Sequence, residues 1–82
     1  MNKVIRVSAK SMGIVSVDMA DGRRGEFDVR PYMTSDFFRE LESEAYFGQV
    51  RVFFYGIGWP NGQDLGPDTV AAELREIESS AV

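Results

Sequence analysis

Residues 14–29 alternate apolar and polar side chains on both sides of an Asp-Gly pair, and this pattern constrains the fold more than any other part of the chain. A period of two is typical of a strand with one buried face, because successive side chains of a strand point to opposite sides. Asp21-Gly22 tolerates the positive φ angles of a tight turn. The segment therefore predicts an antiparallel hairpin with a two-residue turn. Its apolar face comprises Val15, Val17, Met19, Phe27 and Val29.

Two further segments are strand-like. Residues 3–10 (KVIRVSAK) are short, rich in β-branched side chains and bounded by polar residues, which is typical of a strand. Residues 50–59 (VRVFFYGIGW) have the same character, but apolar or aromatic side chains occupy both the even and the odd positions. We therefore expect this second strand to be central in its sheet or to have one face covered by another chain.

Two helices complete the predicted fold. Thr34 or Ser35 can cap a short central helix that begins at Asp36, with a further turn near residues 45–47. Pro67 suits the first position of a terminal helix over residues 67–82. The apolar stripe of that helix consists of Val70, Leu74, Ile77 and Ala81. The sequence thus predicts one small α+β domain over residues 1–82: a small antiparallel sheet (the N-terminal hairpin plus a later strand), one short central helix and a C-terminal helix.

The residue types present leave few routes to catalysis. The chain has no cysteine and no histidine, so a thiolate zinc site, a cysteine nucleophile and the commonest general base are excluded. It contains no phosphate-binding loop motif and no serine-nucleophile motif. The acid pairs Glu40/Glu44 and Asp64/Asp68 are typical of solvated surfaces, and their spacing matches no established ion loop. We expect no enzyme activity, no cofactor and no metal.

The charge of the chain bears on its partners. The net charge is −4, with six Lys/Arg against four Asp/Glu in residues 1–30 and three against nine in residues 31–82. An acidic protein is repelled by phosphate backbones, so direct nucleic-acid binding is disfavoured. The N-terminus lacks the apolar core of a signal peptide, and no run is long enough to span a bilayer. We expect a cytoplasmic protein without a membrane partner, and a homodimer is a further expectation because small cores are often completed by self-association.

Several motifs together resemble a known family. The order of ADGR, FDVRPYM, EAYFGQVRV and WPNGQDLGPDTV over about residues 3–75 is similar to domain of unknown function 2442, a group of small bacterial and phage proteins. The resemblance implies an α+β domain with a small antiparallel sheet. Some members carry a helix-turn-helix domain or lie beside a second small protein in toxin–antitoxin-like gene pairs, which implies regulation or partner binding. We expect no fused DNA-binding domain in this chain.

The stretch GIGWPNGQDLGPDT, residues 56–69, has two interpretations. In the structural one, Asn61-Gly62 forms a tight turn, Trp59 closes the core, and Asp64 bonds to nearby backbone. In the functional one, Trp59 is an exposed anchor for a partner, since tryptophan beside a rigid turn often dominates binding energy. The sequence leaves both open, because it does not distinguish a core aromatic from an interface aromatic.

Three functions remain after these exclusions. The first is a non-enzymatic protein-binding or regulatory module, in which hydrophobic anchors supply affinity and the acidic half steers a basic partner. The second is a small acidic phage-type inhibitor that presents carboxylates to a nucleic-acid-binding complex, such as a bacterial immune effector. The third is a DNA-binding regulator that uses a basic hairpin. The candidate residues for protein binding are Phe53, Tyr55, Trp59, Asn61 and Asp64. The candidate acidic surface of the inhibitor consists of Asp36, Glu40, Glu44, Glu73 and Glu76. The candidate basic hairpin of the DNA-binding regulator carries Arg23 and Arg24.

Overall fold

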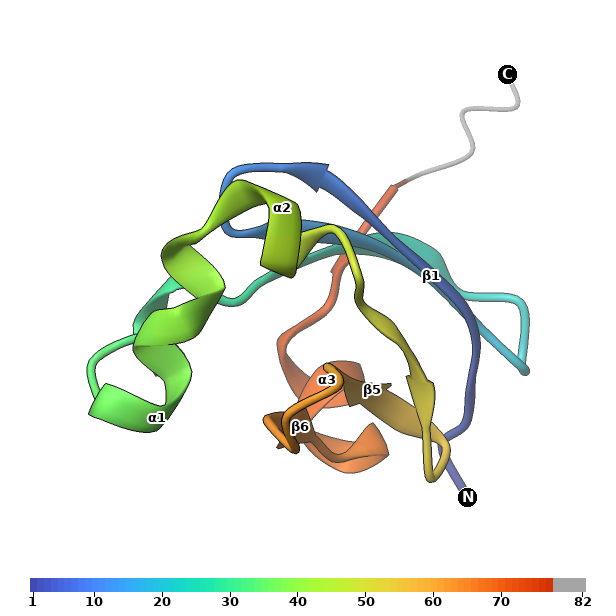
Figure 1. The fold of residues 1–82 in the computed structure, drawn as a ribbon. Coiled ribbons are helices and arrows are strands. Elements are labelled where there is room, and N and C mark those ends of the chain that lie inside the picture. The colour runs from blue at the N-terminus through green and yellow to red at the C-terminus, as the bar shows by residue number, and fades with distance from the viewer. Residues whose placement is uncertain (78–82) are drawn as a thin grey trace.

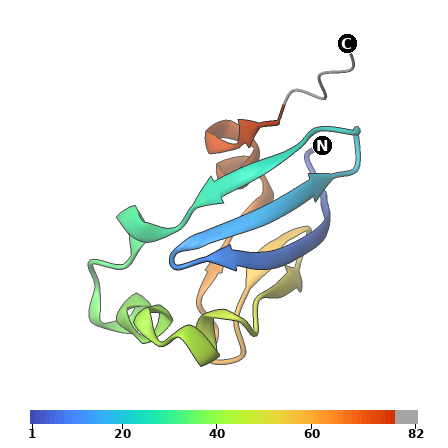
Figure 2. The same ribbon diagram turned by 90° about the horizontal axis from the view of Figure 1, so that it is seen from above.

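The N-terminal strands form a curved antiparallel sheet (Figure 1). The computed structural model describes residues 1–77 of the chain. Strands β1 (Val4–Ser11), β2 (Ile14–Met19) and β3 (Arg24–Asp28) follow one another, and β7 (Arg75–Glu76) joins the free edge of β3. Figure 2 shows the first three strands side by side, with the helical segment beyond one end of them. The five predicted apolar residues of the hairpin are all buried, which confirms the predicted inner face.

The β2–β3 turn is one residue longer than predicted. Asp18 pairs with Arg24, and the amide of Met19 donates to the carbonyl of Arg23, so three residues, 20–22, form the loop. Gly22 has a φ of 98° at its end. A three-residue hairpin loop places a residue with positive φ after an ordinary turn, and glycine meets that requirement without steric cost.

The central helical segment consists of short pieces that cover one end of the sheet (Figure 1). These pieces are η1 (Arg30–Tyr32), α1 (Asp36–Arg39), η2 (Glu40–Glu42) and α2 (Glu44–Phe47). Ser35 caps α1 and Ser43 caps α2, each accepting a hydrogen bond from the amide three residues later. The predicted short helix and its further turn are confirmed, and the segment buries Leu41 and Phe47.

Residues 50–59 form a hairpin instead of the single strand predicted. Strand β4 (Arg51–Phe53) reverses through Phe54 and Tyr55 into β5 (Gly56–Gly58), and β6 (Asp64–Leu65) completes a second sheet. The sequence offers no turn-favouring residue at 54–55, so local preference does not predict this reversal. Pairing of β5 with both β4 and β6 imposes it.

The C-terminal helix is shorter than predicted. Helix α3 (Pro67–Glu73) ends where Leu74 adopts an extended conformation, and the next residues form β7 against β3. The amide of Ile77 donates to the carbonyl of Arg24 at 2.8 Å. Pairing with a sheet edge therefore replaces helical hydrogen bonds at 75–77, and Ile77 is exposed. The predicted stripe residue Ala81 lies outside the described residues.

A single core joins the two sheets, the helical segment and α3. Its members include Val4, Val17, Phe27, Leu41, Ile57 and Val70, each at most 2% exposed. The predicted α+β class is thus confirmed, with two small sheets where one was expected. None of the helices within residues 1–77 has the length and apolar character needed to cross a membrane.

Candidate interaction surface at the β4–β5 turn

The β4–β5 turn is built from two aromatic residues in a costly backbone conformation. Phe54 has a φ of 46° and Tyr55 a φ of 69°. A two-residue loop with positive φ at both positions is the type I′ turn, which normally carries Asn-Gly because a Cβ is strained there. Each such residue costs about 1–2 kcal/mol relative to an ordinary conformation. The chain therefore holds two bulky side chains at positions where glycine or asparagine is favoured.

The side chains of this turn face solvent. Phe54 is 81% exposed, Tyr55 52% and Val52 40%. Phe53 is half-buried, and its ring meets that of Phe54 edge-on at a centroid distance of 4.5 Å. We call residues 52–55 the aromatic turn. Aromatic side chains exposed together on a rigid loop are typical of binding surfaces.

Glycines and a backbone bond hold the aromatic turn in place. A Cβ on Gly56 would lie 2.2 Å from the carbonyl oxygen of Leu65, so only glycine permits β5 and β6 to approach so closely. A Cβ on Gly58 would lie 2.9 Å from the Cβ of Phe53. The carbonyl of Tyr55 accepts a hydrogen bond of 2.7 Å from the amide of Val4, which ties the turn to β1. The aromatic turn is thus fixed by its neighbours.

Two basic side chains accompany the aromatic turn. The Nζ of Lys3 lies 5.1 Å from the ring centroid of Tyr55, within the range of a cation–π interaction. Arg51 is two residues before Phe53 in β4, so both side chains lie on the same face of the sheet. From the sequence, the acidic half of the chain is expected to steer a basic partner, whereas these two side chains next to the turn are basic.

Trp59 belongs to the core. Its side chain is 3% exposed, its ring packs against Phe47 at a centroid distance of 5.6 Å, and its Nε1 donates to the carbonyl oxygen of Phe47 at 2.9 Å. The prediction that Trp59 is an exposed anchor is therefore wrong. The structural interpretation holds here, because a buried indole needs an acceptor and the Phe47 carbonyl at the end of α2 accepts its bond beside a longer one, 3.3 Å, from the amide of Val50.

The loop after Trp59 binds the helical segment through polar side chains. The amide group of Asn61 donates to both carboxylate oxygens of Glu40 at 2.8 Å, and the backbone amide of Asn61 donates to the hydroxyl of Tyr46. Gln63, which is fully buried, donates to the carbonyl of Phe37 and to Glu40, and accepts from Tyr46. Hydrogen bonds from Asn61 and then Gln63 lower the pKa of Glu40. Asn61, a predicted partner-binding residue, thus has a structural role.

Gln63 is the residue that sequence reasoning missed. A glutamine after a turn gives no signal of burial, because polar residues at such positions are usually solvated. Its burial depends on three partners in the helical segment, Phe37, Glu40 and Tyr46, which lie 17 to 26 residues away in the chain. Asp64, by contrast, is exposed, and within residues 1–77 its carboxylate makes no hydrogen bond, so the predicted local bond to backbone is absent.

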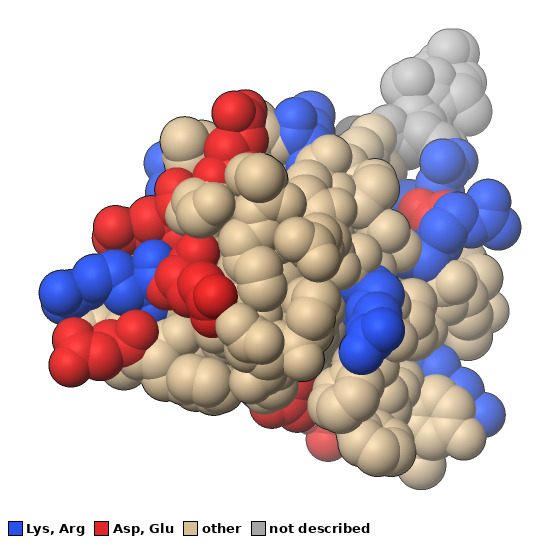
Figure 3. Space-filling model, viewed as in Figure 1, with Lys and Arg blue, Asp and Glu red and all other residues tan. Residues whose placement is uncertain are grey.

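The predicted acidic residues come from three parts of the structure: the helical segment, α3 and β7. Asp36, Glu40 and Glu44 lie along the helical segment, where Figure 3 shows acidic side chains gathered at one end of the molecule. Glu73 ends α3 and accepts hydrogen bonds of 2.7 and 2.8 Å from the hydroxyl of Tyr32, whose pKa these bonds raise. Glu76 lies in β7. Of this set, Asp36, Glu40 and Glu44 lie together on the helical segment, whereas Glu73 and Glu76 lie in two other elements.

The basic hairpin is locally neutralised. Arg23 donates to the carboxylate of Asp21 from its backbone amide at 3.0 Å and from its side chain at 2.9 Å, and these two bonds lower the pKa of Asp21. Its side chain also donates to that of Asn2 at 2.8 Å. Arg24 donates to Asp18 at 3.3 Å. Charges that are already paired attract a phosphate less strongly than free ones.

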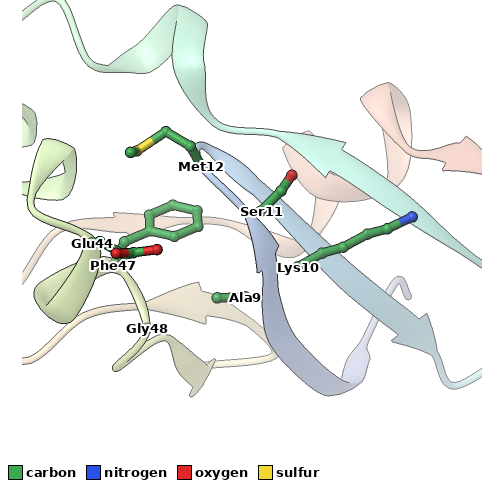
Figure 4. A pocket seen from close by; sticks show the side chains of 7 residues that line it. All are labelled: Ala9, Lys10, Ser11, Met12, Glu44, Phe47 and Gly48. Carbon is green, nitrogen blue, oxygen red and sulfur yellow. The ribbon is translucent and has the colours of Figure 1, made fainter.

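A hollow lies between the β1–β2 turn and α2 (Figure 4). It has a volume of about 190 Å³ and an apolar lining that includes Met12 and Phe47, with Glu44 beside them. The side chain of Lys10 points away from it and pairs with Glu26. Ser11 also lines the hollow, but in the described part of the chain its hydroxyl has no hydrogen bond to a base, so Ser11 and Glu44 do not form an activated nucleophile. Among the described residues, no group of three or more acidic side chains is placed to hold a metal ion.

Comparison with known proteins gives one match. The sequence model of the family described as "Protein of unknown function (DUF2442)" matches residues 4–76, which is most of the chain. The resemblance seen in the motifs is confirmed. No curated protein and no solved structure matches.

Proposed function

Since the chain belongs to the DUF2442 family, whose function is unknown, we propose a function from its geometry: a non-enzymatic module that binds another protein through the aromatic turn. The observation that carries the proposal is the pair Phe54 and Tyr55, which combine positive φ angles with large exposure. In this proposal the chain acts as a regulatory partner, and the identity of the bound protein is left to experiment.

The aromatic turn has the physical properties of a binding anchor. Phe54 and Tyr55 adopt a strained backbone conformation while much of their side-chain surface stays outside the core. Strain of this kind concentrates at functional sites. The fixed position of the turn reduces the entropy lost on binding, because the side chains are already presented. Phenylalanine and tyrosine also supply large contact areas with few rotatable bonds. A partner pocket that covers Phe54 would bury most of an otherwise solvated ring.

The two other functions have weaker support. An acidic inhibitor needs spaced free carboxylates, and Glu40 and Glu73 are engaged by side chains of the same molecule. A DNA-binding regulator needs free arginines on the hairpin, and Arg23 and Arg24 have carboxylate partners. We therefore place both functions behind protein binding.

The test is affinity capture with matched variants. Tagged wild-type protein, Phe54→Ser and Phe37→Ser are incubated with native lysate, with and without nuclease, and the retained proteins are quantified by mass spectrometry. Phe37 is a suitable control because it is an exposed phenylalanine on α1, at 53%. We expect a protein retained by the wild type and by Phe37→Ser and lost with Phe54→Ser. Equal retention by all three folded proteins would remove the aromatic turn from the proposal.

A further inference from the structure

The distribution of ion pairs singles out the surroundings of the aromatic turn. The chain has nine Lys and Arg residues, and seven of them have a carboxylate oxygen within 4.0 Å. Within the part of the chain that the structure describes, the two that form no such pair are Lys3 and Arg51. Lys3 lies over Tyr55, and Arg51 shares a face with Phe53. The unpaired positive charge therefore gathers where the aromatic side chains are exposed.

The nearest acid in strand register does not cancel this charge by contact. Arg51 is opposite Gly58, and Gly58 is opposite Asp64, so Arg51 and Asp64 are separated by two strand spacings. Their backbones are about 10 Å apart, and no ion pair joins their side chains in the described part of the chain. Gly58 places no side chain between them. Arg51 is thus free to meet a carboxylate of a partner.

Most acids of the protein lie elsewhere, apart from Asp64 in β6 and Asp68, which accepts a hydrogen bond from Asn2. In the acidic helical segment, α1 is on the opposite side of the molecule from the β4–β5 turn, and α2 lies between them (Figure 1). Salt screens the field of charges that are more than about 8 Å away. The net charge of −4 consequently does not describe what a partner meets at the aromatic turn.

Resting on the proposed function, we propose that the partner presents a short acidic segment that carries an apolar anchor residue. The anchor packs against Phe54 and Tyr55, and flanking Asp or Glu side chains pair with Lys3 and Arg51. Apolar contact supplies most of the affinity, and the charges set orientation and association rate. The partner's chemistry is therefore opposite to the basic partner that the overall charge favours.

Two other occupants fit the turn less well. A second copy related by two-fold symmetry would bring identical patches together, so that Lys3 and Arg51 would face basic side chains of the same kind. An anionic bilayer attracts basic and aromatic side chains, but the net charge of −4 opposes the approach of the whole protein. An acidic segment contacts only the residues around the turn.

The experiment uses random peptides displayed on phage as the probe. The library is selected on wild-type protein, and each enriched peptide is then measured against Phe54→Ser. We expect the Phe54-dependent peptides to combine Asp or Glu with an aromatic or aliphatic residue. Their affinity should fall about fivefold with Lys3→Glu or Arg51→Glu and more in the double variant, as surface charge pairs of up to about 1 kcal/mol allow. Arg39→Glu, with the same charge change on distant α1, should leave affinity unchanged.

The outcomes separate this inference from the proposed function. Phe54-dependent peptides that are neutral or basic would overturn the acidic partner and leave protein binding standing. Enriched peptides that bind Phe54→Ser equally well, or no enrichment at all, would count against both. Phe54-dependent binding to vesicles of phosphatidylcholine with phosphatidylserine, without acidic peptides, would assign the turn to a lipid surface. Phe54-dependent self-association in sedimentation would assign it to a second copy.

Discussion

The indole Nε1 of Trp59 donates a hydrogen bond of 2.9 Å to the carbonyl oxygen of Phe47. This bond joins the end of β5 to the last turn of α2, and both residues are buried. Together with the contacts of Asn61 and Gln63, it fixes the helical segment against the second sheet. The Trp-Pro-Asn-Gly stretch is therefore the connection between two parts of the core.

Removing this bond tests its structural role. Trp59→Phe keeps a ring in the core and removes the shorter of the two bonds to the Phe47 carbonyl, which retains the 3.3 Å bond from the amide of Val50. We expect the free energy of unfolding to fall by about 1–3 kcal/mol, since a buried hydrogen bond is lost and the smaller ring leaves part of its site unfilled. Urea denaturation followed by circular dichroism measures the change. Phe54→Leu, at an exposed position, serves as the control, with an expected change within about 0.5 kcal/mol. Equal stability of the two variants would contradict the role of the bond.

Replacing the aromatic turn with a favoured turn sequence should stabilise the protein. The double change Phe54→Asn with Tyr55→Gly places Asn-Gly in a type I′ turn and relieves both strained positions. The loss of the Lys3 cation–π contact offsets about 0.5–1 kcal/mol of the gain. We expect a net rise of about 1 kcal/mol in the free energy of unfolding, together with loss of partner binding. A destabilised but folded variant would show that the aromatic turn serves the fold.

Acid should destabilise the protein through Asp28. The side chain of Arg30, bonded at 2.8 and 2.9 Å, lowers the pKa of Asp28 from 3.8 to about 2, with Arg75 nearby. Folding therefore favours the ionised carboxylate, so its contribution is present above the unfolded pKa and is lost as pH falls toward about 2. Denaturant titrations from neutral pH downward should show this decline, and Asp28→Asn should make it shallower. Identical pH profiles for the two proteins would argue against this pair.

The strand at β7 depends on the absence of a side chain at Gly25. A Cβ there would lie 2.2 Å from the carbonyl oxygen of Arg75, closer than any real contact. Gly25→Ala should therefore separate β7 from β3 and free the amide of Ile77, which donates to Arg24. Hydrogen exchange followed by NMR should show faster exchange at Ile77, while Val17 in β2 stays protected. Gly66→Ala is the comparison, because a Cβ there has open space, its φ of −70° suits alanine, and it lies outside β3 and β7.

The sequence alone determined the elements whose pattern is local. The alternation in residues 14–29 predicted the buried face of β2 and β3, and Ser35 predicted the start of α1. The absence of cysteine and histidine restricted the chemistry available to any site. The predictions for the hairpin and for α1 are confirmed because side-chain periodicity and capping act within a few residues.

The tertiary structure decided where the same residue types were buried or exposed. Trp59 and Phe54 are both aromatic residues in one strand-like run, and Trp59 is 3% exposed while Phe54 is 81% exposed. The difference arises because β5 pairs with β4 and β6, which forces the chain to reverse at Phe54-Tyr55, and because α2 offers a carbonyl to Trp59. In the same way, residues 75–77, which were predicted to be helical, are extended because they pair with β3. Hydrogen bonds between distant segments outweighed local preference at each of these positions.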